Sequence, residues 1–411
     1  MPKSIHLFLI LLATCSFLVC LYYNEIEKNV SRRFGPHLLG SNLRNLRSSE
    51  DFSALTGAVL SNVTPSASVQ HGDEYQNNTA RTYYSAYINN ANVSSTETIH
   101  LAVIFCNVGQ KAALKWNFKK MTRSLIKFCS KNVALHFHLV TDPSSWEIAK
   151  EIIHSESKKT QINIQVRPYM NLVGDFFMFF FSFQVSAYFI DTFAKQFVTT
   201  VQVLQQYFSV KQGAYYSQAL FYVSVLLPDV IPSDISRLIF LDVDAEFRDS
   251  VEKLNQQFEY FNDQQLLGLA PELSPVYRHI LYVYRNQHKT SLLGEPKGKG
   301  FPGYNSGVML MKLAKMRQSV IYRSLLTNSS LGNLTDKYSF KGHLGDQDFY
   351  TLVALEHPHL FYTLPCNWNR QLCQWWKSKG YDDIFDLFYE CKGFISLYHG
   401  NCNSQIPDAS N

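Results

Sequence analysis

Long runs of basic residues are missing from this sequence. Lys and Arg total 38 against 33 Asp and Glu, and the resulting formal charge of +5 is spread along the chain. We therefore expect no nucleic-acid partner, because a phosphate backbone needs clustered positive charge. Disorder throughout is also excluded, since 46% of the 411 residues are hydrophobic, which is enough to bury one large core or two modest ones.

Apolar runs long enough to cross a bilayer are equally scarce. Residues 5–23 are almost entirely apolar, and about 19 residues at 1.5 Å each approach the ~30 Å hydrocarbon thickness. We predict a transmembrane signal anchor here, behind a cytoplasmic tail of residues 1–4; a cleaved signal peptide is the alternative. Both deliver the rest of the chain to the secretory lumen. Residues 24–97, rich in Ser, Asn and Thr, are predicted to form a poorly ordered stem.

Cysteine is sparse, with eight in the chain, but it is unevenly placed. Six follow the predicted anchor, and four of these cluster near the C-terminus: Cys366, Cys373, Cys391 and Cys402. An even, clustered set predicts two disulfides, whereas the spacing lacks the paired C-x-x-C of a zinc site. Whether Cys106 pairs with Cys129 stays open. Asn-x-Ser/Thr sequons fit a lumenal location, among them those that begin at Asn77, Asn92, Asn328 and Asn333.

Apolar strand patterns alternate with helical patterns from about residue 98 onward. Runs of strand length occur at residues 100–105, 133–140 and 237–241. Between the first two, apolar residues recur at helical spacing: Trp116, Phe118, Met121, Leu125 and Ile126. This alternation predicts an α/β domain with a mixed, mostly parallel sheet, which we expect to occupy residues 98–408.

Residues 175–201 interrupt this order. Phenylalanines are almost consecutive there: Phe176, Phe177, Phe179, Phe180, Phe181 and Phe183. The stretch is too short and too interrupted for a membrane span. A buried element, a membrane-surface patch and translated non-coding sequence are the alternatives. We favour the last and treat the stretch as an atypical insertion without a function.

Two carboxylates one residue apart follow the apolar run at residues 237–241. Ligands of open α/β sheets bind beyond the carboxyl ends of strands, which is where Asp242 and Asp244 lie. Because side chains alternate along a strand, both are expected on one side, within reach of one cation. Their hard oxygens suit Mn²⁺ or Mg²⁺ on a nucleotide diphosphate. A haloacid-dehalogenase-type phosphatase also carries D-x-D, but at the start of its domain rather than deep inside it.

Three further polar segments carry candidate binding residues. A turn at residues 301–307 contains Asn305 and Ser306, and its glycines are expected to let backbone approach a ligand closely; an ordinary β-turn is the alternative. Asp346 and Gln347 head a helical pattern, where helix capping by Asp346 is the alternative. A short apolar strand ends in His399, a candidate third metal ligand, although a lone histidine is more often structural.

Taken in order, these segments resemble the glycogenin-like family of retaining glycosyltransferases, which includes bacterial lipopolysaccharide galactosyltransferases. The resemblance implies a single Rossmann-like nucleotide-sugar-binding domain of the glycosyltransferase A type. It also implies Mn²⁺, or Mg²⁺, held on the donor diphosphate by Asp242, Asp244 and His399. Four residues would line the sugar pocket, the last two with catalytic roles: Asn305, Ser306, Asp346 and Gln347.

Segments of the C-terminal half resemble the xylosyltransferases of this family more closely: PVYRH at 275–279, the turn at 303–307, GHLGDQDF at 342–349, WNRQLCQWW at 368–376 and YHGNCN at 398–403. This resemblance, over about residues 98–408, implies xylose transfer from UDP-xylose in α-1,3 linkage to a xylose-glucose O-glycan on EGF-like repeats, as of Notch. It implies a single-pass type II enzyme of the endoplasmic reticulum membrane, with the Golgi as second choice.

Residues with weaker support complete the predicted site. Asn107 and Ser217 are candidates for donor contacts. The resemblance points to Leu344 for the acceptor; Asn401 and the aromatic platforms Trp375 and Trp376 are further candidates. Another UDP-sugar specificity on the same scaffold, such as a glucoside xylosyltransferase or a galactosyltransferase, is one alternative. A catalytically silent lumenal glycan-binding protein is the other, which the intact metal and catalytic residues disfavour.

Overall fold

The computed structural model describes residues 98–109, 111–130, 133–159, 165–168, 183–209 and 218–408. The predicted cytoplasmic tail, anchor and stem lie outside these ranges, as does Ser217. Among the described residues, no helix combines the length and the apolar character that a membrane span requires.

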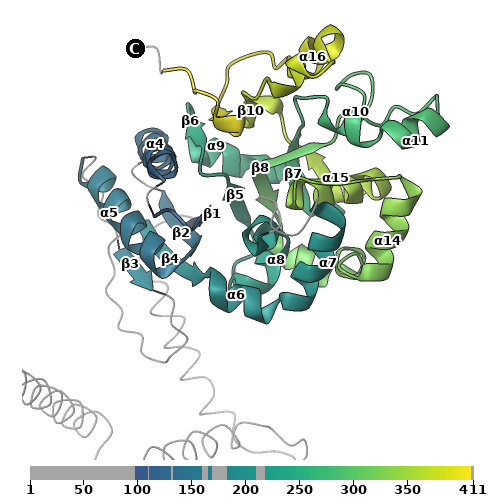
Figure 1. Ribbon diagram of the computed structural model, residues 1–411. Coiled ribbons are helices and arrows are strands. Elements are labelled where there is room, and N and C mark those ends of the chain that lie inside the picture. Colours follow the sequence, from purple (N-terminus) through teal and green to yellow (C-terminus); the bar gives the residue numbers. More distant parts are fainter. Residues whose placement is uncertain are drawn as a thin grey trace, which may run out of the picture. The chain divides into compact units, whose positions relative to one another are not determined.

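Two sheets organise the described residues (Figure 1). The larger has the strand order β3-β4-β2-β1-β5-β8-β7-β9 and the smaller the order β10-β11-β6. The strands of the larger sheet are β1 (Thr98–Phe105), β2 (Ala134–Thr141), β3 (Gln165–Pro168), β4 (Phe183–Phe189), β5 (Leu238–Leu241), β7 (Leu267–Pro271), β8 (Tyr304–Met311) and β9 (Phe361–Thr363). Those of the smaller sheet are β6 (Ala245–Phe247), β10 (Arg370–Gln371) and β11 (Leu397–His399).

The strand directions confirm the predicted mixed, mostly parallel sheet. β1 runs parallel to β2 and β5, and β4 runs parallel to β2 and β3. β8 is antiparallel to β5 and β7, and β7 is parallel to β9. The apolar runs at residues 100–105, 133–140 and 237–241 correspond to β1, β2 and β5.

Helices cover both faces of the large sheet (Figure 1). On one face the core is built against α4 (Ala112–Phe128), α5 (Pro143–Lys159) and α9 (Val251–Gln256). On the other it is built against α6 (Ile190–Gln196), α7 (Val198–Phe208), α8 (Val223–Val230), α10 (Val276–Ile280), α12 (Leu313–Gln318), α13 (Val320–Ser324), α14 (Asn328–Lys337) and α15 (Asp346–Glu356). The remaining α-helices are α11 (Tyr282–Gln287) and α16 (Asp382–Tyr389). Short 3-10 turns are η2 (Ala219–Tyr222), η3 (Gln257–Tyr260), η4 (Pro358–Leu360), η5 (Cys366–Trp368), η6 (Trp375–Ser378) and η7 (Asn401–Asn403).

The central strand β5 is buried on both sides. Leu238 and Phe240 pack into the core on one face of the sheet, and Ile239 and Leu241 pack into the core on the other. A strand covered by helices on both faces needs apolar residues at every position, which explains the unbroken run before the two acids.

The predicted helix between β1 and β2 is α4. Phe118, Met121, Leu125 and Ile126 are buried, but Trp116 is 54% exposed. The helix buries a stripe against β1, and position 116 lies outside that stripe.

The second part of the Phe-rich stretch belongs to the sheet. β4 begins at Phe183 and pairs with β2 from Leu135 opposite Phe183 to Thr141 opposite Phe189. Val185 and Ala187 are buried, and α6 and the start of α7 follow directly. For residues 183–201, strand pairing and burial favour the alternative of a buried element over a translated non-coding insertion. Residues 175–182 lie outside the described ranges.

Two disulfides join the C-terminal cysteines, Cys366 to Cys391 and Cys373 to Cys402. The predicted number of bridges is confirmed, and the zinc alternative fails because each of the four sulfurs is already bonded. In the described part of the chain Cys106 and Cys129 are free thiols.

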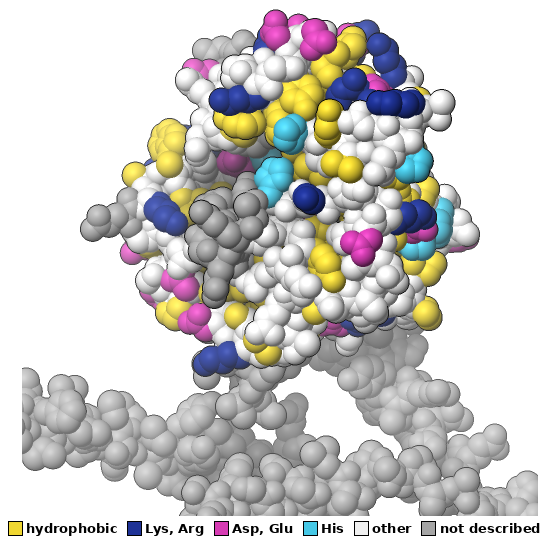
Figure 2. Space-filling view, turned by 45° about the vertical axis from the view of Figure 1, so that its right-hand side comes forward, with side chains coloured by type: hydrophobic (Ala, Val, Ile, Leu, Met, Phe, Trp, Pro, Cys, Tyr) yellow, Lys and Arg dark blue, Asp and Glu magenta, His cyan; other side chains and the backbone are white. Residues whose placement is uncertain are grey.

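Charged side chains of both signs are interspersed on the face of the molecule in Figure 2.

Candidate active site

The acidic pair lies in a turn rather than on a strand. β5 ends at Leu241, and residues 242–244 carry the chain into β6, with the Ala245 amide donating to the Asp242 carbonyl (3.1 Å). The Asp242 amide donates to the carbonyl of Gly307 on β8 (2.8 Å), which ties the turn to the next strand. The prediction that strand alternation aligns the carboxylates is therefore wrong, because a hydrogen-bonded turn positions them.

His399 reaches these acids from the C-terminal part of the chain. β11 pairs antiparallel with β6, which places His399 opposite Ala245. The Nε2 atom of His399 lies 3.5 Å from Oδ2 of Asp242 and 3.3 Å from Oδ1 of Asp244. One potential ligand atom from each residue lies within 4.8 Å of the other two. The structure thus brings the three predicted metal ligands together.

The charges in this cluster fit a cation. His399 is 3% exposed, whereas the side chain of Asp242 is 46% exposed. Burial alone would lower the pKa of His399, but the charge of Asp244 and hydrogen bonds to both carboxylates outweigh it and raise the pKa to about 10. In the metal-free protein His399 is therefore protonated, because the neighbouring carboxylates of Asp242 and Asp244 stabilise its positive charge. Two carboxylate oxygens and one imidazole nitrogen are a ligand set that suits Mn²⁺, and its binding would release that proton.

A buried amide behind His399 sets the orientation of the imidazole. Nδ1 of His399 lies 3.0 Å from Oδ1 of Asn369, which is fully buried. Because an amide oxygen only accepts, Nδ1 carries a proton and Nε2 is the nitrogen that faces the acids. Partners of this kind fix the tautomer and the ring orientation of metal-ligating histidines.

Asn305 joins this amide to the predicted sugar-binding residues. Asn369 Nδ2 donates to Oδ1 of Asn305 (2.9 Å). Asn305 Nδ2 in turn donates to Oε2 of Glu272 and to Oε1 of Gln347 (3.0 Å each). Gln347 Nε2 donates back to Oε2 of Glu272 (3.2 Å), so both ends of the Gln347 amide are engaged. One hydrogen-bonded network therefore runs from Gln347 to the imidazole of His399.

Asp346 belongs to the site and does not cap its helix. α15 begins after Gly345, while the Asp346 carboxylate points to other elements and accepts hydrogen bonds from Ser224 Oγ and Ser306 Oγ. Burial is the main cause that raises the pKa of Asp346, to about 7, and the charge of Asp242 adds to it against the hydrogen bond from Ser224. The capping alternative is therefore wrong.

Gly307 allows His399 to pack directly on β8. Asn305, Ser306 and Gly307 lie within this strand rather than in a turn before it. A Cβ atom on Gly307 would lie 2.2 Å from Cε1 of His399, which is far inside contact distance. The close approach that the sequence predicted for a ligand is thus made by the imidazole.

Of the two candidate donor-binding residues, the structure describes Asn107 but not Ser217. Asn107 follows β1, whose C-terminal end shares an edge of the sheet with that of β5, since Val103 pairs with Leu241. Its backbone amide donates to Oδ2 of Asp142 (2.6 Å). Ser217 lies outside the described residues.

Two of the candidate acceptor residues are close in sequence to residues of the candidate site: Leu344 precedes Asp346, and Asn401 follows His399. Leu344 lies just before α15, where its amide donates to Oδ2 of Asp348 (2.6 Å). Asn401 follows His399 by two positions, and its Oδ1 accepts from the amides of Leu372 and Cys373 (2.9 Å each). Asn401 therefore anchors the backbone of the 368–376 segment.

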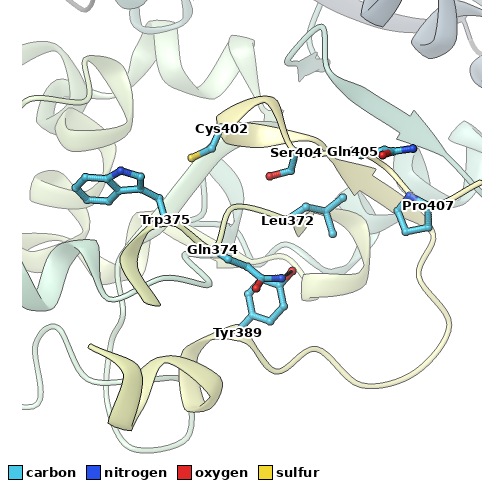
Figure 3. Close-up of a pocket in the computed structure, with 8 residues that line it drawn as sticks. All are labelled: Leu372, Gln374, Trp375, Tyr389, Cys402, Ser404, Gln405 and Pro407. Atoms are coloured by element: carbon cyan, nitrogen blue, oxygen red, sulfur yellow. Dashed lines mark hydrogen bonds between the residues drawn. The ribbon is translucent and has the colours of Figure 1, made fainter. Parts of the chain in front are cut away.

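The two tryptophans differ in their surroundings. Trp376 packs against His279, with ring centroids 5.1 Å apart. Trp375 is 54% exposed and lines a pocket of about 600 Å³ (Figure 3). The amide of Leu372, in the wall of this pocket, donates to the carbonyl of His399 (3.1 Å), so the pocket lies next to the strand that carries the histidine. The full lining is Leu372, Gln374, Trp375, Tyr389, Cys402, Ser404, Gln405 and Pro407.

Known proteins resemble this chain over most of its length. The profile of glycosyl transferase family 8 matches residues 73–385. The chain belongs to glycosyl transferase family 8. Xyloside xylosyltransferase 1 of Mus musculus and that of Homo sapiens are each 36% identical to it over 311 residues, which are 75% of this chain and 75% of each relative.

A solved structure agrees with this family assignment. The crystal structure of mouse xyloside xylosyltransferase 1, apo form, matches with a TM-score of 0.67 and 35% identity, covering 76% of this chain and all of the crystallised chain. Human xylosyl- and glucuronyltransferase LARGE1 is 28% identical over 72% of this chain but only 32% of that relative. The predicted family, the predicted fold and the prediction of a glycosyltransferase are confirmed.

Three residues of this family 8 site were not predicted. Glu272 directly follows the buried strand β7, as Asp242 follows β5, so the same strand-end signal was present. Asn369 lies in the WNRQLCQWW segment, but nothing in that segment marks it as the partner of a histidine 30 residues away. Ser224 lies in the apolar helix α8, where the sequence carries no sign of its contact with Asp346.

Proposed function

We propose that this family 8 glycosyltransferase moves xylose from UDP-xylose, with retention at the anomeric carbon, in α-1,3 linkage to a xylose-glucose O-glycan on EGF-like repeats such as those of Notch. The observation that carries the proposal is the convergence of Asp242, Asp244 and His399 beyond the C-terminal end of β5. The names of the relatives at 36% identity support xylose as the transferred sugar.

Mn²⁺, with Mg²⁺ as the alternative, is the proposed cofactor. Asp242, Asp244 and His399 would hold it, and when bound it supplies a Lewis acid that stabilises the departing diphosphate. The chain itself contributes the orientation of the ligands. Asn369 holds the imidazole, and the amide of Asp242 is tied to β8, so the cluster needs little rearrangement to bind a cation.

Gln347 is proposed to orient the donor sugar rather than to attack it. A double displacement needs a nucleophile on the face opposite the leaving UDP, and an amide is a poor one. The Gln347 amide is also held at both ends, by Asn305 and Glu272, and an attack would break these bonds. Front-side attack with retention needs only a stabilised leaving group and a fixed donor, which this network supplies.

The acceptor glycan is proposed to bind along the pocket that contains Trp375. An exposed indole next to polar groups is a suitable platform for a sugar ring, because it offers apolar area with little loss of side-chain entropy. Asn401, Leu372 and Cys402 connect this pocket to the strand of His399. Leu344, before α15, is proposed to contact the same acceptor.

The proposed location is the endoplasmic reticulum membrane, with the Golgi as second choice. An anchor at residues 5–23 would leave the catalytic part in the lumen as a single-pass type II protein. The two disulfides support an oxidising compartment.

A donor screen tests the proposed function. The full-length chain with Mn²⁺ and a synthetic xylose-glucose acceptor is assayed with UDP-xylose, UDP-glucose and UDP-galactose. We expect UDP-xylose to be preferred by about 10²-fold, because a pocket closed around xylose rejects the extra hydroxymethyl group of a hexose. A preference for a hexose donor would assign another specificity on this scaffold. No transfer from any donor would favour a silent glycan-binding protein.

A further inference from the structure

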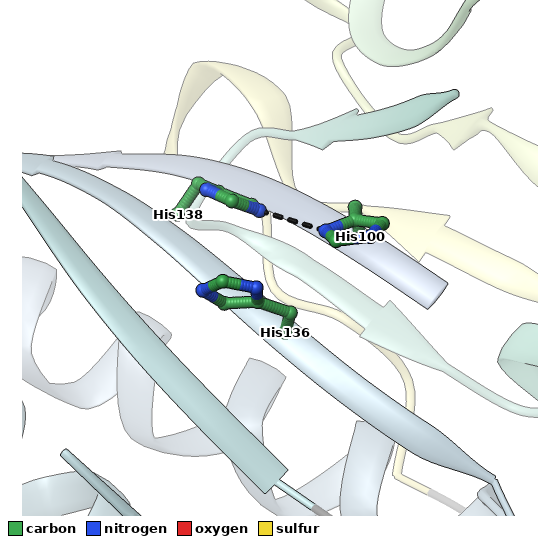
Figure 4. Close-up of side chains that lie close together, drawn as sticks. All are labelled: His100, His136 and His138. Carbon is green, nitrogen blue, oxygen red and sulfur yellow. Dashed lines mark hydrogen bonds between the residues drawn. The ribbon is translucent and has the colours of Figure 1, made fainter. Parts of the chain in front are cut away.

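Three histidines lie side by side on the large sheet, apart from the active site. His100 is on β1, and His136 and His138 are on β2, with their rings grouped on one side of the two strands (Figure 4). His100 pairs with His136, and a spacing of two along β2 puts His138 on the same face as His136. His100 and His136 lie near the amino ends of their strands, whereas the acidic turn follows the carboxyl end of β5.

The distances between the rings resemble those of a metal site. Nδ1 of His100 and Nε2 of His138 are 3.0 Å apart. Two nitrogens bound to one tetrahedral Zn²⁺ at about 2.0–2.1 Å are separated by roughly 3.3 Å. One ring nitrogen from each of the three histidines lies within 4.8 Å of the other two. The rings of His136 and His138 lie against each other, with centroids 4.1 Å apart, so His136 must turn its ring to point a nitrogen at the same ion.

Hydroxyl groups on β4 hold two of the rings from outside the cluster. Nδ1 of His138 lies 2.9 Å from the hydroxyl of Tyr188, and Nε2 of His136 lies 2.8 Å from the hydroxyl of Ser186. The opposite nitrogens, Nε2 of His138 and Nδ1 of His136, are then the ones available to an ion. Outer partners of this kind are typical of metal-bound histidines, whose second nitrogen is fixed by a hydrogen bond.

The three rings are in the protonation state that a metal site needs. Burial lowers the pKa of all three histidines, that of His136 to about 4, so the rings are neutral, which is the form that binds metals. The charge of Asp234, in the exposed loop before β5, acts on His100 and His136 in the opposite direction.

We propose that His100, His136 and His138 bind one Zn²⁺ ion, with water in the fourth position. An all-imidazole set selects Zn²⁺ over Mn²⁺ and Mg²⁺, which prefer oxygen ligands, so this ion differs from the one at Asp242 and Asp244. The ion joins neighbouring strands β1 and β2, and its role is structural. In the metal-free protein the hydrogen bond between His100 and His138 holds two of the rings together, and the ion would replace it.

Zinc binding is measured on a full-length Asp244→Asn variant, in which the catalytic cation site is disabled. The protein is stripped with a chelator, incubated with Zn²⁺ and desalted, and the bound metal is quantified by mass spectrometry. We expect one equivalent of zinc and a rise in Tm on the order of 5 °C at a zinc concentration of about 100 times Kd. Adding His100→Gln should remove both effects, whereas adding His154→Gln, an exposed histidine on α5, should leave both.

The experiment tests the zinc site independently of the proposed enzyme activity, because it measures bound zinc and Tm and does not measure sugar transfer. Absence of bound zinc in the Asp244→Asn chain, or equal zinc in the His100→Gln chain, overturns the proposal. If His100→Gln lowers the Tm of the metal-free protein and so is destabilising by itself, the same comparison is made with His136→Gln. Cobalt gives a second measurement: Co²⁺ at this site should show the intense visible absorption of a tetrahedral ion, and a spectrum that His136→Gln leaves unchanged contradicts the assignment.

Discussion

At the scale of single residues, His399 uses its two ring nitrogens for different purposes. Nε2 faces the carboxylates of Asp242 and Asp244, and Nδ1 is held by Asn369. The same amide reaches Gln347 through Asn305, so the proposed metal ligands and the proposed sugar-binding residues share one network. A substitution at Asn369 should therefore change the affinity for the metal ion, although Asn369 is not itself a metal ligand.

Asn369→Ala should weaken Mn²⁺ binding by about 10- to 100-fold, because His399 loses the partner that orients it. The measurement is the Mn²⁺ concentration that gives half-maximal transfer, with turnover partly recovered at high Mn²⁺. Asn367→Ala is the matched control, since Asn367 lies two positions away and bonds to Ser396 instead. An unchanged half-saturating concentration in Asn369→Ala would show that the amide does not position the histidine.

The carboxyl group of Asp346 should make the metal-free protein sensitive to pH. Its pKa is about 7 in the folded chain against an ordinary value of 3.8, so the unfolded chain releases this proton first. The contribution of this group to the free energy of unfolding is therefore fully present below about pH 4. It is lost as the pH rises to about 7, which lowers the free energy of unfolding by at most about 4 kcal/mol.

Melting curves of the wild type and Asp346→Asn in chelator test this dependence. We expect the Tm of the wild type to fall relative to that of Asp346→Asn as the pH rises through this interval. Asp382→Asn, at an exposed position on α16, serves as the control and should follow the wild type. Parallel curves for the wild type and Asp346→Asn would refute the raised pKa.

The sequence predicted most residues with a local signal, but it missed Glu272, which follows a buried strand, and the residues that have no such signal. Asp242 and Asp244 follow an apolar run, and Asp346 and Gln347 head a helical pattern, so position alone made them candidates. The roles of Asn369 and Ser224 depend on partners 30 and 122 positions away, and only the fold brings these together. The prediction that strand alternation aligns Asp242 and Asp244 was also wrong, because a run of apolar residues does not show at which residue a strand ends and a turn begins.

At the scale of elements, the position of His399 depends on the small sheet. β11 lies between β6, which follows the acidic turn, and β10, which follows η5. The disulfides from Cys366 to Cys391 and from Cys373 to Cys402 tie the chain segments on either side of this sheet. The second bridge involves a residue three positions after His399, so it restrains the strand that presents the imidazole.

Replacing Cys373 and Cys402 by serine should lower the free energy of unfolding by about 3–4 kcal/mol, the loop-closure contribution of one bridge of this size. Denaturant unfolding with and without reductant measures the loss. Cys129→Ser, which removes a free thiol, is the control and should behave as the wild type. Insensitivity of the wild-type protein to reductant would contradict a stabilising role of the bridges.

At the scale of the whole molecule, the sheet brings distant segments to one edge. β5 and β8 are antiparallel neighbours, so the residues after the end of β5 meet Asn305 and Ser306 near the start of β8. The alternation of strands and helices made this sheet predictable. The integration of β4 was not, because a cluster of phenylalanines hid a strand whose pairing with β2 is visible only in three dimensions.

Mn²⁺-dependent transfer by Asp244→Asn tests the central claim most directly. The assay uses UDP-xylose and the xylose-glucose acceptor, with Asp383→Asn on the exposed side of α16 as the control. The account predicts that Asp244→Asn stays folded but loses at least about 10²- to 10³-fold in turnover, while Asp383→Asn matches the wild type. Near-normal turnover of Asp244→Asn with Mn²⁺ would contradict a cation site formed by Asp242, Asp244 and His399.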